Sequence, residues 1–192
     1  MQIRYPIKLT IKEYLEQRAW EQVELEHCPF HPEGGCGLAK HGFYPRKFPE
    51  YCLVARWYCP NAHQTISLLP DFFASRIPGT LDEVEQVVNT AESCKSQEDA
   101  AQTLRPDISL IAGLRWLRRR LGYVRQALTL MVGLLVTQCA PVLAAFRKKY
   151  VTNSVLTRLR DIAAEHLPSL PPIIGFGPRC RVRYCHGFSA NN

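Results

Sequence analysis

Cysteine and histidine gather in one short part of this sequence, and they constrain its fold more than any other feature. Residues 27–63 include the runs "HCPFHPEGGCG" and "YCPNAHQ", in which Gly, Pro and Asn favour turns. A bound cation, rather than a large apolar interior, is therefore expected to organise this part of the chain. The candidate ligands in it are Cys28, His31, Cys36, Cys59 and His63.

The start of the chain bears on the chemical state of these sulfur atoms. The run "MQIRYPIKLTIKEYLEQRAW" alternates charged and apolar residues and lacks the unbroken apolar stretch of a secretory signal. A cytoplasmic location is therefore expected. In that compartment the eight cysteines of the chain are better interpreted as free thiols or metal ligands than as disulfides.

The spacing of the cysteines and histidines predicts a zinc site. A small zinc ribbon supplies four ligands as two close pairs on tight turns, and Cys59 with His63 forms the second pair. For the first pair we prefer Cys28 and Cys36, because the Cys-Pro and Cys-Gly steps suit turns whose amides point at a thiolate; His31 is the alternate ligand. We expect none of the acids near these ligands to serve as a general base, which indicates a structural Zn²⁺. The alternative is a set of buried thiols and surface histidines without a metal.

The regions around the cysteines predict a mainly α fold with a small β zinc-ribbon. Short runs such as "LVARWY" and "QTISLL" between turns indicate the strands, and apolar residues at helical spacing indicate helices before and after them. The expected order is an N-terminal helix in 1–26, a zinc-ribbon-like domain in 27–78, a helical domain in 79–168 with a helix-turn-helix-like segment in 80–121, and a basic, flexible tail in 169–192.

Capping patterns predict where the later helices begin. Thr80 and Glu83 have capping-box spacing before "LDEVEQVV", and Ser96 stands three residues before an acid in "SQEDAAQTL". A third helix is expected from Asp107 through "ISLIAGLRWLRRRL", and a last one spans roughly 154–166.

The stretch "EDAAQTLRPDISLIAGLRWLRRRL" has the layout of a helix-turn-helix motif, with alanines for the supporting helix and "LRPD" for the turn. Leucines recur on one side of the following helix and arginines on the other. Residues 105–125 hold six arginines against Asp107, and the whole chain carries a net charge of +7. This balance favours an anionic partner, with DNA ahead of a membrane surface. The base-edge candidates are Arg115 and Arg119, and the phosphate candidates are Arg118, Arg120 and Arg125.

Three basic residues of the ribbon extend this prediction. Arg46, Lys47 and Arg56 alternate with aromatic residues and are expected to hold the DNA backbone while bases stack beside them. The alternatives are that the basic helix face is simply solvated and that the aromatic residues form the small core of the ribbon.

An uncharged stretch raises a different possibility. From Gln126 to Phe146, 21 residues pass without a charge, which at about 1.5 Å per residue is enough to cross a bilayer. Gln138 and Pro141 interrupt this run, so a core hairpin or a dimer interface explains it better. A small membrane-associated protein anchored by 126–146 is the alternative.

The runs "HGFYPRK" and "RWYCPNAHQTISLLPDFF" resemble the zinc-ribbon head of a family of bacterial proteins associated with transposases. In that family two Cys pairs flank an HG-x-Y-x-R segment, and a strand like "TFSLLPDFL" follows. "CAPVLAAF" and "LPPIIGFGPR" are similar to parts of uncharacterised proteins found around mobile elements, so the resemblance touches most of the chain. The chain departs from the pattern at Ala62, where the family has its second Cys. The resemblance implies a DNA-binding factor that accompanies a transposon, with a transposase or a second copy of the chain as a further partner.

Patterns typical of catalysis are missing from the sequence. The acids cluster on expected helix faces instead of converging on divalent metals, and there is neither a Gly-rich phosphate loop nor a G-x-S-x-G motif. We therefore expect a non-catalytic, zinc-dependent DNA-binding protein. The remaining alternatives are the membrane-anchored protein and a zinc-ribbon module that binds another protein.

Overall fold

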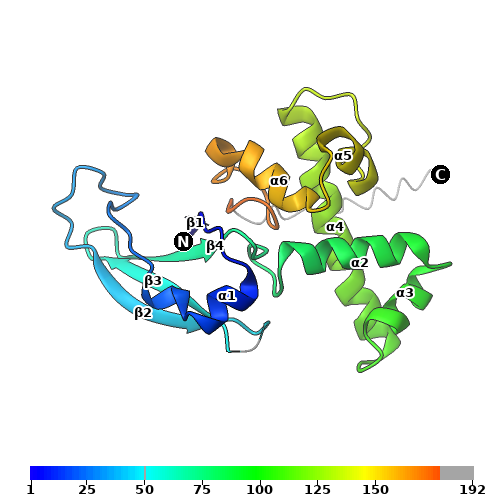
Figure 1. Cartoon of the computed structure of the whole chain (residues 1–192), viewed down its shortest axis with the longest axis horizontal. Helices are drawn as coiled ribbons and strands as arrows, with labels where there is room; N and C mark the ends of the chain where they lie inside the picture. The colour runs from blue at the N-terminus through cyan, green and yellow to red at the C-terminus, as the bar shows by residue number, and fades with distance from the viewer. Residues whose placement is uncertain (50, 178–192) are drawn as a thin grey trace, which may run out of the picture.

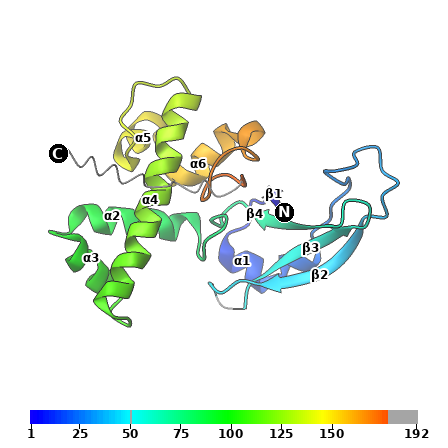
Figure 2. The ribbon, with the colours of Figure 1, turned by 180° about the vertical axis from the view of Figure 1, so that it is seen from behind.

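The computed structural model describes residues 1–49 and 51–177, which form two parts joined by a shared core (Figure 1). The first part is a sheet with a short helix and the Cys- and His-containing loops, and the second is a group of helices around one long helix. Figure 2 shows the same two parts from behind. The shared core contains Tyr14, Val54 and Leu69 from the first part and Leu128 and Phe146 from the second.

One mixed sheet forms the first part. Its strands are β1 (Gln2–Tyr5), β2 (Ala39–Pro45), β3 (Leu53–Cys59) and β4 (Gln64–Pro70). Their order is β1-β4-β3-β2, with β1 parallel to β4 and the other neighbours antiparallel. Because side chains alternate between the faces of a strand, Leu68 packs in a small core around the cysteines and Leu69 packs in the shared core.

The fold is mixed α/β, so the prediction of a mainly α protein with an N-terminal helix ahead of the ribbon is wrong. The chain begins with β1, and the helix that follows, α1 (Ile11–Glu16), is short although Thr10 and Glu13 form a capping box. Ile3 and Tyr5 pack against the small core while β1 pairs with β4. The helical pattern begins only at about Thr10, where α1 does start, and the pairing with a strand more than 60 residues away makes a strand of the residues before it.

The second part consists of five α-helices among the described residues: α2 (Leu81–Ser93), α3 (Gln97–Leu104), α4 (Leu110–Leu134), α5 (Leu143–Tyr150) and α6 (Val155–Ile162). The predicted starts at Thr80 and Ser96 are confirmed, since each side chain accepts a hydrogen bond from the third amide beyond it. Ser109 caps α4 in the same way. Short 3₁₀ turns at Ala19–Glu21 and Ala164–His166 complete the helical structure.

The uncharged stretch 126–146 folds as a bent hairpin in the core. The end of α4 occupies its first half, a turn follows, and α5 begins at Leu143. Leu128, Met131 and Phe146 from this stretch are at most 2% exposed. Among residues 1–49 and 51–177, no helix is both long enough and apolar enough to cross a membrane.

A buried arginine fixes the junction between the two parts. Arg160 of α6 is fully buried, and its guanidinium donates hydrogen bonds of 2.6–2.9 Å to four backbone carbonyls. Two belong to the segment after β4 and two to the end of the described chain. Burial lowers the pKa of Arg160 to about 10, so the group stays charged at neutral pH. The acceptors are Asp71, Phe73, Ile173 and Ile174.

Further polar contacts support the same junction. Arg4 of β1 binds the Asp71 carboxylate with hydrogen bonds of 2.6 and 3.0 Å and also binds Asp161 of α6. The Ser75 hydroxyl donates to the Gly175 carbonyl. The tail expected from residue 169 thus begins with a stretch that packs into the core, and its remainder, 178–192, lies outside the described residues.

Replacing Arg160 is expected to destabilise the whole chain. In Arg160→Met several buried carbonyls lose their donors, and each unpaired group costs about 1–3 kcal/mol. The free energy of unfolding from urea titration should therefore fall by about 4 kcal/mol or more. Arg158→Ala, an exposed arginine on the same helix, should change it by less than about 0.5 kcal/mol. Equal effects of the two substitutions would contradict this account of the junction.

Candidate metal centre and basic helix face

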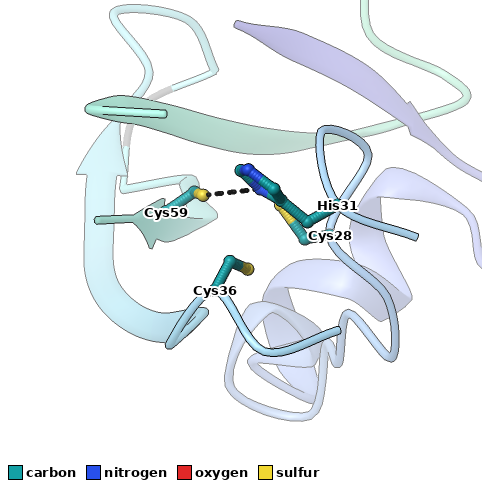
Figure 3. A group of neighbouring side chains, drawn as sticks. All are labelled: Cys28, His31, Cys36 and Cys59. Atoms are coloured by element: carbon teal, nitrogen blue, oxygen red, sulfur yellow. Dashed lines mark hydrogen bonds between the residues drawn. The ribbon is translucent and has the colours of Figure 1, made fainter. Parts of the chain in front are cut away.

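Four ligand groups converge at the end of the sheet where β3 ends and β4 begins. Cys28, His31, Cys36 and Cys59 each offer one ligand atom, and these atoms all lie within 4.8 Å of one another. Figure 3 shows the four side chains pointing toward a common centre, with Cys59 on the end of β3 and the other three on the loop before β2. The His31 Nδ1 lies 3.4 Å from the Cys59 sulfur and 3.7 Å from the Cys28 sulfur. The group is therefore compact enough to bind one metal ion.

Tight turns hold the sulfur atoms and direct backbone amides at them. The turn at Cys28 is closed by a hydrogen bond from the His31 amide to the Cys28 carbonyl, so the ligands at i and i+3 lie side by side. Gly37 directly follows Cys36 and has a φ of 66°, a conformation that glycine adopts without strain. The amide donors to the three sulfur atoms are Phe30 and His31 for Cys28, Leu38 for Cys36 and Ala62 for Cys59.

These hydrogen bonds favour a thiolate at Cys28. Burial is the largest influence on its pKa and raises it, but hydrogen bonds from the His31 side chain and the Phe30 amide together lower the pKa to about 6. Burial and the neighbouring Cys28 sulfur raise the pKa of Cys36. Cys28 is therefore favoured as a thiolate at neutral pH. Thiolates at Cys36 and Cys59 would repel it unless a cation lies between them.

The ligand group occupies the centre of the small core. Cys28, Cys36 and Cys59 are at most 3% exposed and cluster with Trp57, and their neighbours in this core also include Val23, Ala55, Ile66 and Leu68. This apolar core contains far fewer buried residues than the core that the sheet shares with the helices. A metal ion bound at its centre would link the loop before β2 to the end of β3, which gives it a structural position.

The structure brings together three of the four preferred ligands and the alternate one. His63 lies outside the group: it is exposed, follows the turn after Cys59 with a φ of 49°, and its Nδ1 is 3.4 Å from the Tyr58 hydroxyl. The number of residues between each histidine and its cysteine explains why His31, and not His63, joins the group. His31 is three residues after Cys28 and completes a turn with it, whereas His63 is four residues after Cys59 and lies beyond the turn that the Ala62 amide forms.

Most of the arginines predicted to bind nucleic acid lie on the surface of α4. Arg115, Arg118, Arg119 and Arg125 are exposed, and none of them is in a salt bridge within the described part of the chain. Arg118 donates a hydrogen bond of 3.0 Å to Gln97 of α3. Behind this face, α3 supports α4 through buried small residues and a leucine: Ala100, Ala101, Gly113 and Leu117.

The predicted basic residues of the sheet part have different surroundings. Arg46 donates hydrogen bonds to the carbonyls of Ala74, Ile77 and Gly79, and its guanidinium lies 4.6 Å from the Phe73 ring centre. Its donors are thus engaged within the protein. Lys47 is exposed and Arg56 is half-buried on β3, while Arg120 of α4 lies 4.1 Å from the ring centre of Trp116.

Metal content should separate the two histidines. His31→Ala and Cys59→Ser each remove a ligand from the group, so the purified proteins should contain much less than the full equivalent of metal found in the unchanged chain. His63→Ala should retain it. Mass-spectrometric metal analysis measures all three variants, and a loss confined to His63→Ala would show that the fourth ligand has been misassigned.

Removing the metal should loosen the small core selectively. After chelation, amide hydrogen exchange is expected to accelerate in residues 28–38 and around Cys59, because the sulfur atoms then lose their common partner. Protection in α4 should persist, since its core is apolar and contains no ligand of the group. Unchanged exchange around the cysteines after complete chelation would contradict a structural metal.

Comparison with known proteins gives no family for this chain: neither a family model, nor a curated protein, nor a solved structure matches it significantly. The resemblance to transposase-associated proteins therefore stays a prediction, and the chemistry of the residues themselves is the basis for a function.

Proposed function

We propose that this chain is a non-enzymatic, zinc-stabilised DNA-binding protein. The observation that carries the proposal is the row of exposed arginines on α4, which has no carboxylate partner among the described residues. The metal centre lies where β3 ends and contributes to the proposal as a stabilising element.

The ligand set favours zinc over other metals. Three thiolates and one imidazole form the Cys₃His set of structural zinc sites, in which Zn–S is about 2.3 Å and Zn–N about 2.0–2.1 Å. A tetrahedron with these bond lengths sets its ligand atoms roughly 3.5–3.8 Å apart. The separations of His31 Nδ1 from the Cys59 and Cys28 sulfur atoms, 3.4 and 3.7 Å, agree with such a tetrahedron. Four protein ligands fill all positions, so the zinc is proposed to be structural.

The arrangement of α3 and α4 supports DNA as the partner. The short α3 packs against the first half of α4, and Gly113 brings the two backbones close, since a Cβ there would lie 3.5 Å from the Ala101 side chain. A supporting helix behind a long exposed helix is the layout with which helix-turn-helix proteins enter the major groove. Arg115 and Arg119 are the proposed base-edge contacts, and Arg118 and Arg125 the proposed phosphate contacts.

The biological setting is a proposal from the resemblance alone. A DNA-binding factor with a zinc-stabilised module would accompany a mobile element by positioning a transposase at its DNA ends. The partner in that setting would be the transposase or a second copy of this chain.

A second candidate function is protein binding by the sheet part. β2 is an edge strand of the sheet, and six of its seven residues are exposed. Phe43 on this strand is 36% exposed, and Tyr51 in the loop after it is 87% exposed. A free strand edge beside exposed aromatic rings is a surface that a partner strand can extend.

DNA affinity should depend steeply on salt, and the arginines of α4 should set that dependence. For a mixed-sequence duplex, the logarithm of affinity should fall linearly with the logarithm of salt concentration, with a slope of about −0.9 per phosphate contact. Arg115→Ala/Arg118→Ala removes one proposed base-edge contact and one proposed phosphate contact, so it should lower the affinity and reduce the slope by about 1. Fluorescence anisotropy at a series of salt concentrations measures both quantities.

The matched control is Lys148→Ala/Arg158→Ala, which removes the same charge from exposed positions on α5 and α6. It should leave the slope close to that of the unchanged chain. A nearly flat salt response of the unchanged chain would contradict DNA binding and favour the protein-binding candidate. Equal effects of the two double variants would show that only net charge matters and that α4 is not the contact surface.

A further inference from the structure

A groove opens between the two parts of the molecule. Its volume is about 660 Å³, which lies within the range of small-molecule sites. The β2–β3 loop forms one wall with Lys47 and Phe48, and the ends of α3 and the first half of α4 form the other. Pro78, Gly79, Val84 and Val87 line the space between the walls.

Four cationic side chains line this groove: Lys47, Arg105, Arg119 and Arg120. Burial lowers the pKa of Arg120 to about 10, and repulsion from Arg105 and Arg119 contributes to the shift. A half-buried guanidinium near two like charges raises the free energy of the protein when no ligand is bound. An anion in the groove would replace repulsion by attraction, and so these charges favour an anionic ligand.

Two carboxylates also line the groove, and both already accept hydrogen bonds. Glu83 accepts a hydrogen bond of 2.7 Å from the Thr80 amide in the capping box of α2. Asp107 accepts two hydrogen bonds of 2.7 Å from Arg105. Lys47, Arg119 and Arg120 are in no salt bridge within residues 1–49 and 51–177. Arg120 donates one hydrogen bond of 3.4 Å to the Pro78 carbonyl, which leaves its other N–H groups to contact a ligand.

The groove also offers apolar and aromatic surface, which a bare inorganic anion would not use. Phe48 stands on the wall with its side chain 52% exposed, in the same loop as Lys47. Trp116 lines the opposite wall, where the guanidinium of Arg120 lies 4.1 Å from its ring centre. An exposed ring beside a group of cations matches a ligand that has a flat aromatic portion and a phosphate.

The wall that carries Lys47 and Phe48 is anchored. The preceding residue, Arg46, binds three carbonyls in the segment before α2, and its own amide donates to the Cys52 carbonyl across the loop at 2.8 Å. The loop is thus tied to the segment that forms the floor of the groove, and the two walls keep a defined separation. A preformed groove loses less free energy on ligand binding than a surface that must first become ordered.

We propose that this groove binds a nucleoside phosphate, with the phosphate at Lys47, Arg119 and Arg120 and the base stacked on Phe48. The nucleotide is either free or part of a nucleic-acid strand, since both present the same chemistry. The site shares Arg119 with the proposed duplex-binding face of α4, but Arg115 and Arg118 of that face do not line the groove. Nucleotide binding therefore does not require duplex DNA to lie on α4.

ATP is the probe for this site, and isothermal titration calorimetry measures its dissociation constant. Phe48→Ala should weaken ATP binding about tenfold, because stacking on one aromatic side chain contributes about 1–3 kcal/mol. Lys47→Ala should weaken it about three- to tenfold and reduce its salt dependence. Both side chains are exposed, so neither substitution should unfold the chain. Lys148→Ala on α5 is the matched control and should leave ATP binding unchanged.

Three further titrations complete the test. Adenosine and inorganic triphosphate should each bind at least tenfold more weakly than ATP, because each lacks one half of the ligand. A single-stranded oligonucleotide that competes with ATP, and loses affinity in the same variants, would identify a strand as the source; lack of competition would identify a free nucleotide. The proposal is overturned if ATP does not bind, if triphosphate binds as tightly as ATP, or if Phe48→Ala and Lys47→Ala match Lys148→Ala. Arg115→Ala/Arg118→Ala should leave ATP binding intact, so failure here and failure of duplex binding are distinguishable.

Discussion

The buried guanidinium of Arg160 is the interaction on which the arrangement of the two parts depends. Burying a charge is costly, and here four carbonyl groups, together with the nearby carboxylates of Asp71 and Asp161, reduce that cost. The acceptors come from the exit of β4 and from the end of the described chain, so a single side chain joins α6 and the residues after it to a segment that lies 87–89 residues earlier. The sheet and the helices are held at a fixed relative position as a result.

Away from this junction, the two parts are stabilised in different ways. The helices and one face of the sheet share a large apolar core, which needs no cofactor. The opposite face of the sheet has only a small core, and three of its buried side chains are the thiols of the metal group. The proposed contacts with nucleic acid and nucleotide lie on or beside the helices, while the cation would stabilise the sheet at the end opposite the loop that carries Lys47.

Local signals in the sequence were enough to predict several elements. Thr80 and Ser96 determine helix starts through contacts within four residues, and Cys28, Cys36 and Cys59 were recognisable from turn residues beside them. The rest depends on distant contacts. β1 becomes a strand only because β4 lies beside it, and the choice of His31 over His63 depends on how the loop before β2 folds back onto β3. The role of Arg160 was not visible either, because its acceptors are backbone carbonyls, which any sequence supplies.

The two walls of the groove belong to different parts of the molecule, and this has a thermodynamic consequence. Lys47 and Phe48 belong to the loop between β2 and β3 of the sheet, whereas Arg119 and Arg120 belong to α4. A ligand held across the gap would act as a clamp between the two bodies. By linkage, whatever tightens their docking must raise the affinity for that ligand, and the ligand must in turn strengthen the docking by the same factor.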